Sequence, residues 1–162
     1  MSRRVCVSLA LAVAAACHTP PGAVRSDVQA YLQHMKNWAA VEAETARTAE
    51  RILATEFVDE AEVRHQIADS RPRIQVHLEQ IRAYTPRTEE VQHIHDEYRR
   101  AWEDMLAAYD AIEQGFSSGD YTKLARGRSQ MSAWRDGIMR VAQELGELAD
   151  RVGASRDGAT ET

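Results

Sequence analysis

The chain has 162 residues, of which 44% are hydrophobic, and its 20 Lys and Arg against 25 Asp and Glu give a formal net charge of −5 at pH 7. An acidic surface lacks the basic stripe that nucleic-acid binding requires, and it disfavours electrostatic docking onto anionic lipid. No run of alternating apolar residues rich in Val, Ile and Thr occurs, so we expect one all-α domain with almost no strand.

The N-terminal segment has the pattern of an export signal. Arg3 and Arg4 precede about a dozen apolar residues, which end in small residues before Cys17. This pattern resembles the lipobox of bacterial lipoproteins, in which the cysteine is lipidated and becomes the first residue of the mature chain. The resemblance implies a signal peptide over residues 1–16 and a lipid on Cys17. It also implies a membrane anchor in the cell envelope, facing the periplasm or the exterior, and His18 at the next position favours the outer membrane.

Two other interpretations of this segment stay open. Ala14-Ala15-Ala16 also satisfies the A-x-A rule of an ordinary secretory signal, with cleavage at the same bond. The second interpretation is a membrane anchor that is not cleaved off, although the apolar stretch is well short of the ~20 residues that a spanning helix needs. Of the two cysteines, Cys6 lies in the segment that cleavage removes, so Cys17 has no disulfide partner and lipidation is the simplest explanation for it. Loss of Arg3 and Arg4 lowers Lys and Arg from 20 to 18 and takes the net charge from −5 to −7.

The rest of the chain predicts four amphipathic helices. Residues 17–25 contain Pro20-Pro21-Gly22 and form a short extended tether. Apolar residues at alternating steps of four and three predict a first helix over about 27–56. We expect a second helix from about residue 60, with Pro72 bending it near the middle.

A third helix begins near Pro86 and runs to about 114, where Gly115 stops it, and a fourth ends at about 152. We expect residues 153–162 to be disordered. Short connections make sequential helices antiparallel, so residues 26–152 form an up-down-up-down four-helix bundle. A pair of long hairpins that completes its core by dimerisation is the alternative.

Several histidines fall at one level of this bundle. Counting inward from the helix ends places His34, His77, His93 and His95 about 10 Å from the end where the tether enters. Imidazole pairs bind zinc, copper or nickel, so His34, His77 and His95 form a candidate metal site. Solvated surface histidines are the simpler interpretation.

Polar residues interrupt the apolar seams near mid-bundle. Glu42 breaks the seam of the first helix, Arg128 and Arg135 break that of the fourth, and Arg71 is level with them. A Glu42–Arg pair would fix the register of the helices. Alternatively, a pocket floored by three tryptophans holds a free arginine that binds an anionic or aromatic ligand. The tryptophans are Trp38, Trp102 and Trp134.

The sequence holds no motif for catalysis. It has no Gly-x-Ser-x-Gly elbow, no phosphate-binding glycine loop and no Cys-x-x-Cys-His. We therefore expect no enzyme and no cofactor. Two hypotheses for the function follow. The first is a structural or protein-interaction module with an unidentified protein partner. It predicts a well-packed core and a Glu42–Arg pair. The second is a bundle that binds a small ligand or transition metal, with a mid-bundle cavity or converging histidines.

Overall fold

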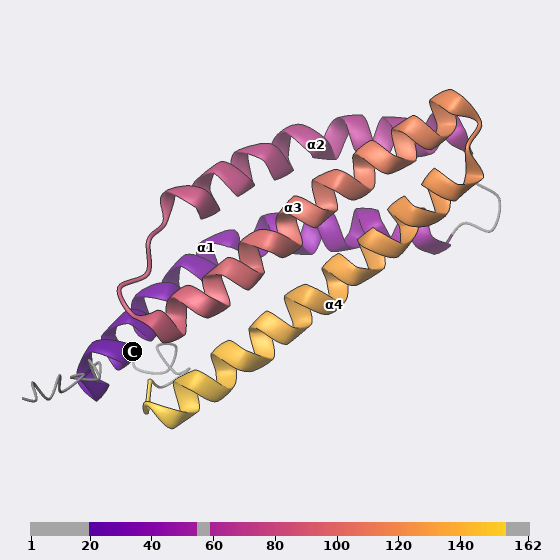
Figure 1. Cartoon of the computed structure of the whole chain (residues 1–162). Helices are drawn as coiled ribbons and strands as arrows, with labels where there is room; N and C mark the ends of the chain where they lie inside the picture. Colours follow the sequence, from indigo (N-terminus) through magenta and orange to yellow (C-terminus); the bar gives the residue numbers. More distant parts are fainter. Residues whose placement is uncertain (1–19, 55–58, 155–162) are drawn as a thin grey trace, which may run out of the picture.

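The computed structural model describes residues 20–54 and 59–154, which form four α-helices and no strand. The helices are α1 (Pro21–Ala54), α2 (Glu60–Ala83), α3 (Glu89–Ser118) and α4 (Tyr121–Arg151). Successive helices run in opposite directions, so α1 and α3 begin at the same end of the molecule, which we call the N-terminal end (Figure 1). The predicted all-α antiparallel four-helix bundle is confirmed.

Three helix ends differ from the sequence prediction, one of them the start of α3, which begins at Glu89 so that Pro86 lies outside the helix. The first helix begins at Pro21, so residues 21–25, predicted as extended tether, are helical. Proline suits the first turn of a helix because its fixed φ is already helical and its missing N–H needs no partner there. The third helix continues past Gly115 and ends at Ser118, with Gly119 in the left-handed conformation at φ 65°.

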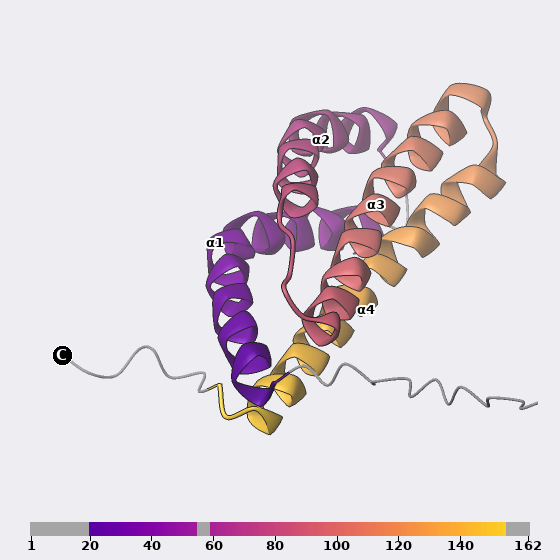
Figure 2. The same ribbon diagram turned by 60° about the vertical axis from the view of Figure 1, so that its left-hand side comes forward.

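Helices α3 and α4 pack most closely, because glycines let the two backbones approach. A Cβ on Gly127 would lie 2.5 Å from Cγ1 of Ile112 and 2.7 Å from the carbonyl oxygen of Ala108. Gly115 is buried for the same reason, since its Cβ would lie 2.7 Å from the side chain of Leu124. The two helices therefore form a tight hairpin, and they lie side by side in both views (Figures 1 and 2).

A carboxylate from α1 holds the start of α3. Asp27 is 1% exposed, and its Oδ2 accepts hydrogen bonds from the backbone N–H groups of Arg87 and Thr88, at 2.8 and 2.9 Å, and from the Thr88 hydroxyl at 2.9 Å. Thr88 is the N-cap of α3 but makes no capping bond with its own side chain. A negative charge at a helix N-terminus is favourable, so Asp27 joins α1 to α3 at the N-terminal end.

None of the helices described is both long and apolar enough to cross a membrane. The predicted signal peptide, Cys17 and most of the predicted tail lie outside the described residues. Within that tail, Gly153 and Ala154 are described, and Ala154 is buried with its N–H bonded to the carbonyl oxygen of Ala149 at 2.8 Å.

Candidate functional site

Aromatic and histidine rings from all four helices meet in the half of the bundle nearest the N-terminal end. Neighbouring ring centroids lie 4.3 to 6.3 Å apart, the range in which aromatic pairs attract each other. We call this set the aromatic layer. Its members are Tyr31, His34 and Trp38 of α1, His77 of α2, Tyr84 just after α2, His95, Tyr98 and Trp102 of α3, and Trp134 of α4.

A chain of hydrogen bonds crosses the middle of the aromatic layer. The hydroxyl of Tyr98 donates to Oε2 of Glu42 at 3.2 Å, and Nε2 of His77 lies 3.3 Å from the same hydroxyl. Burial raises the pKa of the Glu42 carboxyl, although the bond from Tyr98 opposes this, and burial lowers the pKa of His77 to about 4. His77 is therefore neutral near pH 7, and burial keeps the charged form of either residue unfavourable.

A second histidine–tyrosine pair lies nearer the N-terminal end. Nδ1 of His95 is 3.3 Å from the hydroxyl of Tyr31, and both residues are buried. Burial lowers the pKa of His95 and raises that of Tyr31, so both groups are neutral at pH 7. The two buried histidines thus each use a tyrosine hydroxyl as a hydrogen-bond partner.

The predicted histidine metal site is not assembled in this arrangement. His34 packs its ring on Tyr84 at 4.3 Å between centroids, while His77 and His95 face different tyrosines. Within the described part of the chain, the three histidines do not form a group whose ligand atoms lie close enough to hold one ion. The structure does place all three in one layer, as their positions in the helices predict.

The predicted arginines do not reach Glu42, whose hydrogen-bond partner is Tyr98. Arg128 donates to the carbonyl oxygens of Ile52 and Leu53 at the end of α1, at 3.0 and 2.7 Å. Arg135 is half exposed, and its Nε lies 3.7 Å from Asp136 on its own helix. The described residues therefore contain no pair between Glu42 and an arginine.

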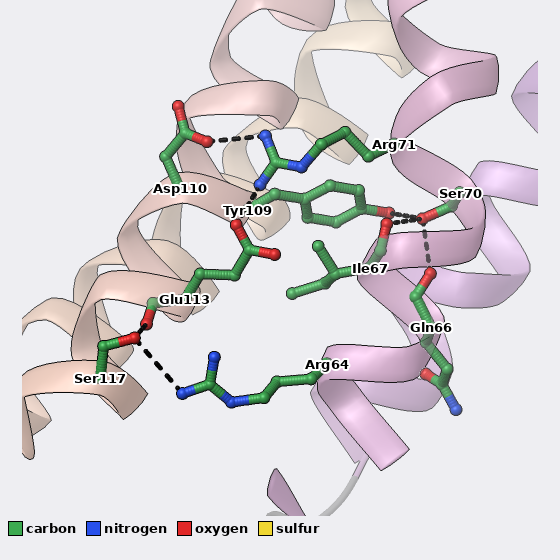
Figure 3. A network of polar contacts seen from close by, with 9 residues as sticks. All are labelled: Arg64, Gln66, Ile67, Ser70, Arg71, Tyr109, Asp110, Glu113 and Ser117. Atoms are coloured by element: carbon green, nitrogen blue, oxygen red, sulfur yellow. Dashed lines mark hydrogen bonds and ion pairs between the residues drawn. The ribbon is translucent and has the colours of Figure 1, made fainter. Parts of the chain in front are cut away.

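Arg71 joins α2 to α3 instead (Figure 3). Its guanidinium donates to Asp110 at 2.7 Å and to Glu113 at 2.6 Å. Beside this ion pair, the hydroxyl of buried Ser70 lies 2.9 Å from that of Tyr109, and these two residues precede Arg71 and Asp110 in the chain. These contacts fix α2 on α3, and they occupy the Arg71 guanidinium that the sequence offered as a partner for an anionic ligand.

A groove runs along the seam between α1 and α2 and borders the aromatic layer. Its first section has a volume of about 530 Å³ and its second about 300 Å³, and Gln80 lines both. We call the two sections together the α1–α2 groove. The first is lined by His34, Asn37, Trp38, Gln80, Ala83 and Tyr84, and the second by Val41, Pro72, Arg73, Val76, His77 and Gln80.

An ion pair closes the groove at its far end. Arg73 of α2 pairs with Glu44 of α1, and beyond this pair the seam becomes charged and polar. The groove itself has one charged lining residue, Arg73, whose charge Glu44 neutralises. The site is thus a groove with aromatic walls, and the described residues that line it include no Lys, Arg, Asp or Glu other than the paired Arg73.

Tyr31 and Tyr84 of the aromatic layer were missed at the sequence level, although a signal for Tyr31 exists. Tyr31, His34 and Trp38 have the same spacing as His95, Tyr98 and Trp102, with rings at positions i, i+3 and i+7 of each helix. Residues at this spacing share one helix face, so two such triplets predict two ring-bearing faces that meet. Comparison with known proteins adds no further candidate, because no protein-family model, curated protein or solved structure matches the chain.

Proposed function

We propose that this protein is a lipid-anchored binding protein of a bacterial cell envelope, and that the α1–α2 groove binds a small, planar, uncharged aromatic ligand. The observation that carries the proposal is the contact between this groove and the aromatic layer, through His34, Trp38, Tyr84 and His77. Binding rather than catalysis fits a site that offers aromatic faces and amide groups. The predicted lipid on Cys17 would hold the bundle at the membrane surface, with His18 favouring the outer membrane.

The lining of the groove selects the class of ligand. Rings of Trp38 and Tyr84 offer faces and edges for stacking, and the amides of Asn37 and Gln80 offer hydrogen bonds beside them. The volumes of the two sections fall within or at the edge of the range of about 300 to 1,000 Å³ that is typical of small-molecule sites. A charged ligand would find no unpaired partner in the groove, because the one lining arginine is bound to Glu44.

The hydrogen bonds of His77 indicate that the ligand carries a donor. The Tyr98 hydroxyl donates to Glu42, so its oxygen accepts from the Nε2–H of neutral His77. That tautomer leaves Nδ1 of His77 as an acceptor, and Nδ1 is buried without a hydrogen-bond partner among the described residues. A ligand N–H or O–H that reached this nitrogen would satisfy a buried polar group, which is worth ~1–3 kcal/mol.

The test uses two ring compounds of the same shape. Indole carries an N–H, and benzofuran replaces it with an oxygen that cannot donate. We expect calorimetry to show indole binding with a dissociation constant of about 1 mM, equivalent to about −4 kcal/mol, and weaker binding of benzofuran. Ala83→Trp fills the first section of the groove from its exposed edge and should abolish binding, whereas Ala61→Trp, on the exposed face of α2 outside the groove, should not. Equal binding by both Trp variants would refute the site.

A protein-interaction module is the second function that we propose, on one observation. Val76 lines the groove but is 55% exposed, so apolar surface continues from the groove onto the outside of α2. A photo-crosslinking residue at position 76 should then give one discrete protein adduct in cells, and Ala83→Trp should remove it. Absence of an adduct, together with indole binding, would leave the small-ligand function.

A further inference from the structure

A second group of ligand-type side chains lies outside the groove, on the face shared by α3 and α4. A ring nitrogen of His93 and carboxylate oxygens of Glu97 and Glu144 all lie within 4.8 Å of one another. His93 and Glu97 are one turn apart on α3, with Nε2 of His93 3.6 Å from Oε1 of Glu97, and Glu144 reaches them from α4. We infer that these three side chains form a zinc site, separate from His34, His77 and His95.

Among the described residues, neither carboxylate of this group is paired with a Lys or an Arg. Arg100 and Arg140 line the hollow beside Glu97, but across the described residues no Lys or Arg nitrogen lies within 4.0 Å of Glu97 or Glu144. Four other acidic residues of α3 are paired with arginines, namely Asp96, Glu103, Asp110 and Glu113, while Glu89, Glu90 and Asp104 have no ion pair among the described residues. Glu97 and Glu144 therefore converge on His93 without a Lys or Arg in direct contact, and a divalent cation could bind all three side chains.

The backbone that carries the group is held firmly. Glu97 and Glu144 lie on the tightly packed α3–α4 hairpin, where the Cβ of an alanine at Gly137 would lie 3.3 Å from the Cβ of Ala101, one turn from Glu97. Zinc binds His nitrogen at ~2.0–2.1 Å and carboxylate oxygen at ~2.0–2.2 Å, so ligand atoms around a tetrahedral ion lie about 3.3 Å apart. Rotation of exposed and half-buried side chains can close 4.8 Å to that spacing without moving a helix.

The donor set favours zinc over the commoner hard cations. One imidazole nitrogen with two carboxylates suits zinc, whereas calcium and magnesium prefer six or more oxygen ligands, or sites that retain several waters. Three protein ligands leave the fourth position of a tetrahedral ion open to water or to an external group. The site is thus of the open kind, accessible from solvent because the His93 side chain is 66% exposed.

A zinc titration of the full chain tests the inference, with Cys6→Ser and Cys17→Ser so that no thiol competes. We expect calorimetry with zinc chloride to show one site. His93→Ala and Glu144→Gln should each weaken it at least about tenfold, since removal of even a residue that only supports a metal ligand costs 10- to 100-fold. Circular dichroism should show that both variants remain folded.

The chain supplies its own matched control. His65 of α2 also faces a carboxylate one turn away, with Nε2 3.3 Å from Oδ2 of Asp69, but the pair belongs to no three-residue ligand group among the described residues. His65→Ala should leave zinc affinity unchanged. The inference is overturned if zinc does not bind, if His65→Ala weakens binding as much as His93→Ala, or if Glu144→Gln has no effect.

Discussion

Replacement of His77 by glutamine should remove a large part of the protein's acid sensitivity. His77 is 1% exposed, and burial lowers its pKa from 6.5 to about 4. The unfolded chain therefore takes up the proton before the folded one does. The contribution of neutral His77 to stability is complete above about pH 6.5 and is lost as the pH falls toward 4.

The size of this effect follows from the two pKa values. Each pH unit between 6.5 and about 4 is worth 1.36 kcal/mol, so complete protonation costs about 3 kcal/mol. Between pH 7 and pH 4.5 the loss is about 2.5 kcal/mol, a large fraction of the 5–15 kcal/mol that stabilises a typical domain. His95, whose pKa is also lowered by burial, adds to the loss, whereas Glu42, whose pKa burial raises, opposes it.

Urea unfolding at a series of pH values measures the effect. Glu42 and His95 are present in both proteins, so the difference between wild type and His77→Gln isolates His77. Glutamine changes the packing by a constant amount, and only the change with pH counts. Exposed His65→Gln should keep the wild-type pH profile. If His77→Gln lost as much stability between pH 7 and pH 4.5 as the wild type, His77 would not be held neutral by burial.

Three further substitutions test the anchor and the packing. Cys17→Ser should release the protein from the membrane fraction, whereas Cys6→Ser, in the predicted signal peptide, should not; retention of the Cys17 variant would contradict lipidation. Asp27→Ala should lower the free energy of unfolding by about 2–4 kcal/mol in urea, because it leaves buried backbone donors at the start of α3 unpaired. Gly127→Ala should cost about 1–3 kcal/mol by overpacking, measured by thermal melting, and Gly22→Ala, which meets nothing within 4 Å, should cost nothing.

The spacing of apolar residues was enough to predict four helices, since each helix buries one continuous stripe, and the short connections were enough to predict that successive helices are antiparallel. The prediction that Gly115 ends the third helix was wrong. Glycine can end a helix, but its missing side chain also allows two helices to pack closely. Gly115 lies under Leu124, a contact between α3 and α4 that sequence spacing does not reveal. Gly119, four residues later, supplies the left-handed conformation that ends the helix.

The position of a side chain along its helix was easier to predict than the direction in which it points around the helix axis. Counting residues from helix ends placed His34, His77 and His95 at one level, and they do share the aromatic layer. The same counting put Glu42 level with arginines, but Glu42 points toward Tyr98. An error of one residue turns a helix by ~100°, so small uncertainties in register decide which side chains meet.

The two halves of the bundle use different kinds of contact, and this difference explains where a ligand can enter. Gly127 and Gly137 let α3 and α4 approach so closely that an added Cβ would lie 2.5 Å from Ile112 and 3.3 Å from Ala101. On the opposite side, large rings such as Trp38 and Tyr84 fill the space between helices and hold α1 at a distance from α2. Rings at the surface fill the space between two helices less completely than two closely packed backbones do. A groove therefore remains along the seam between α1 and α2. The rigid hairpin therefore serves as the scaffold, and the ring-lined seam is the part of the fold that can accept another molecule.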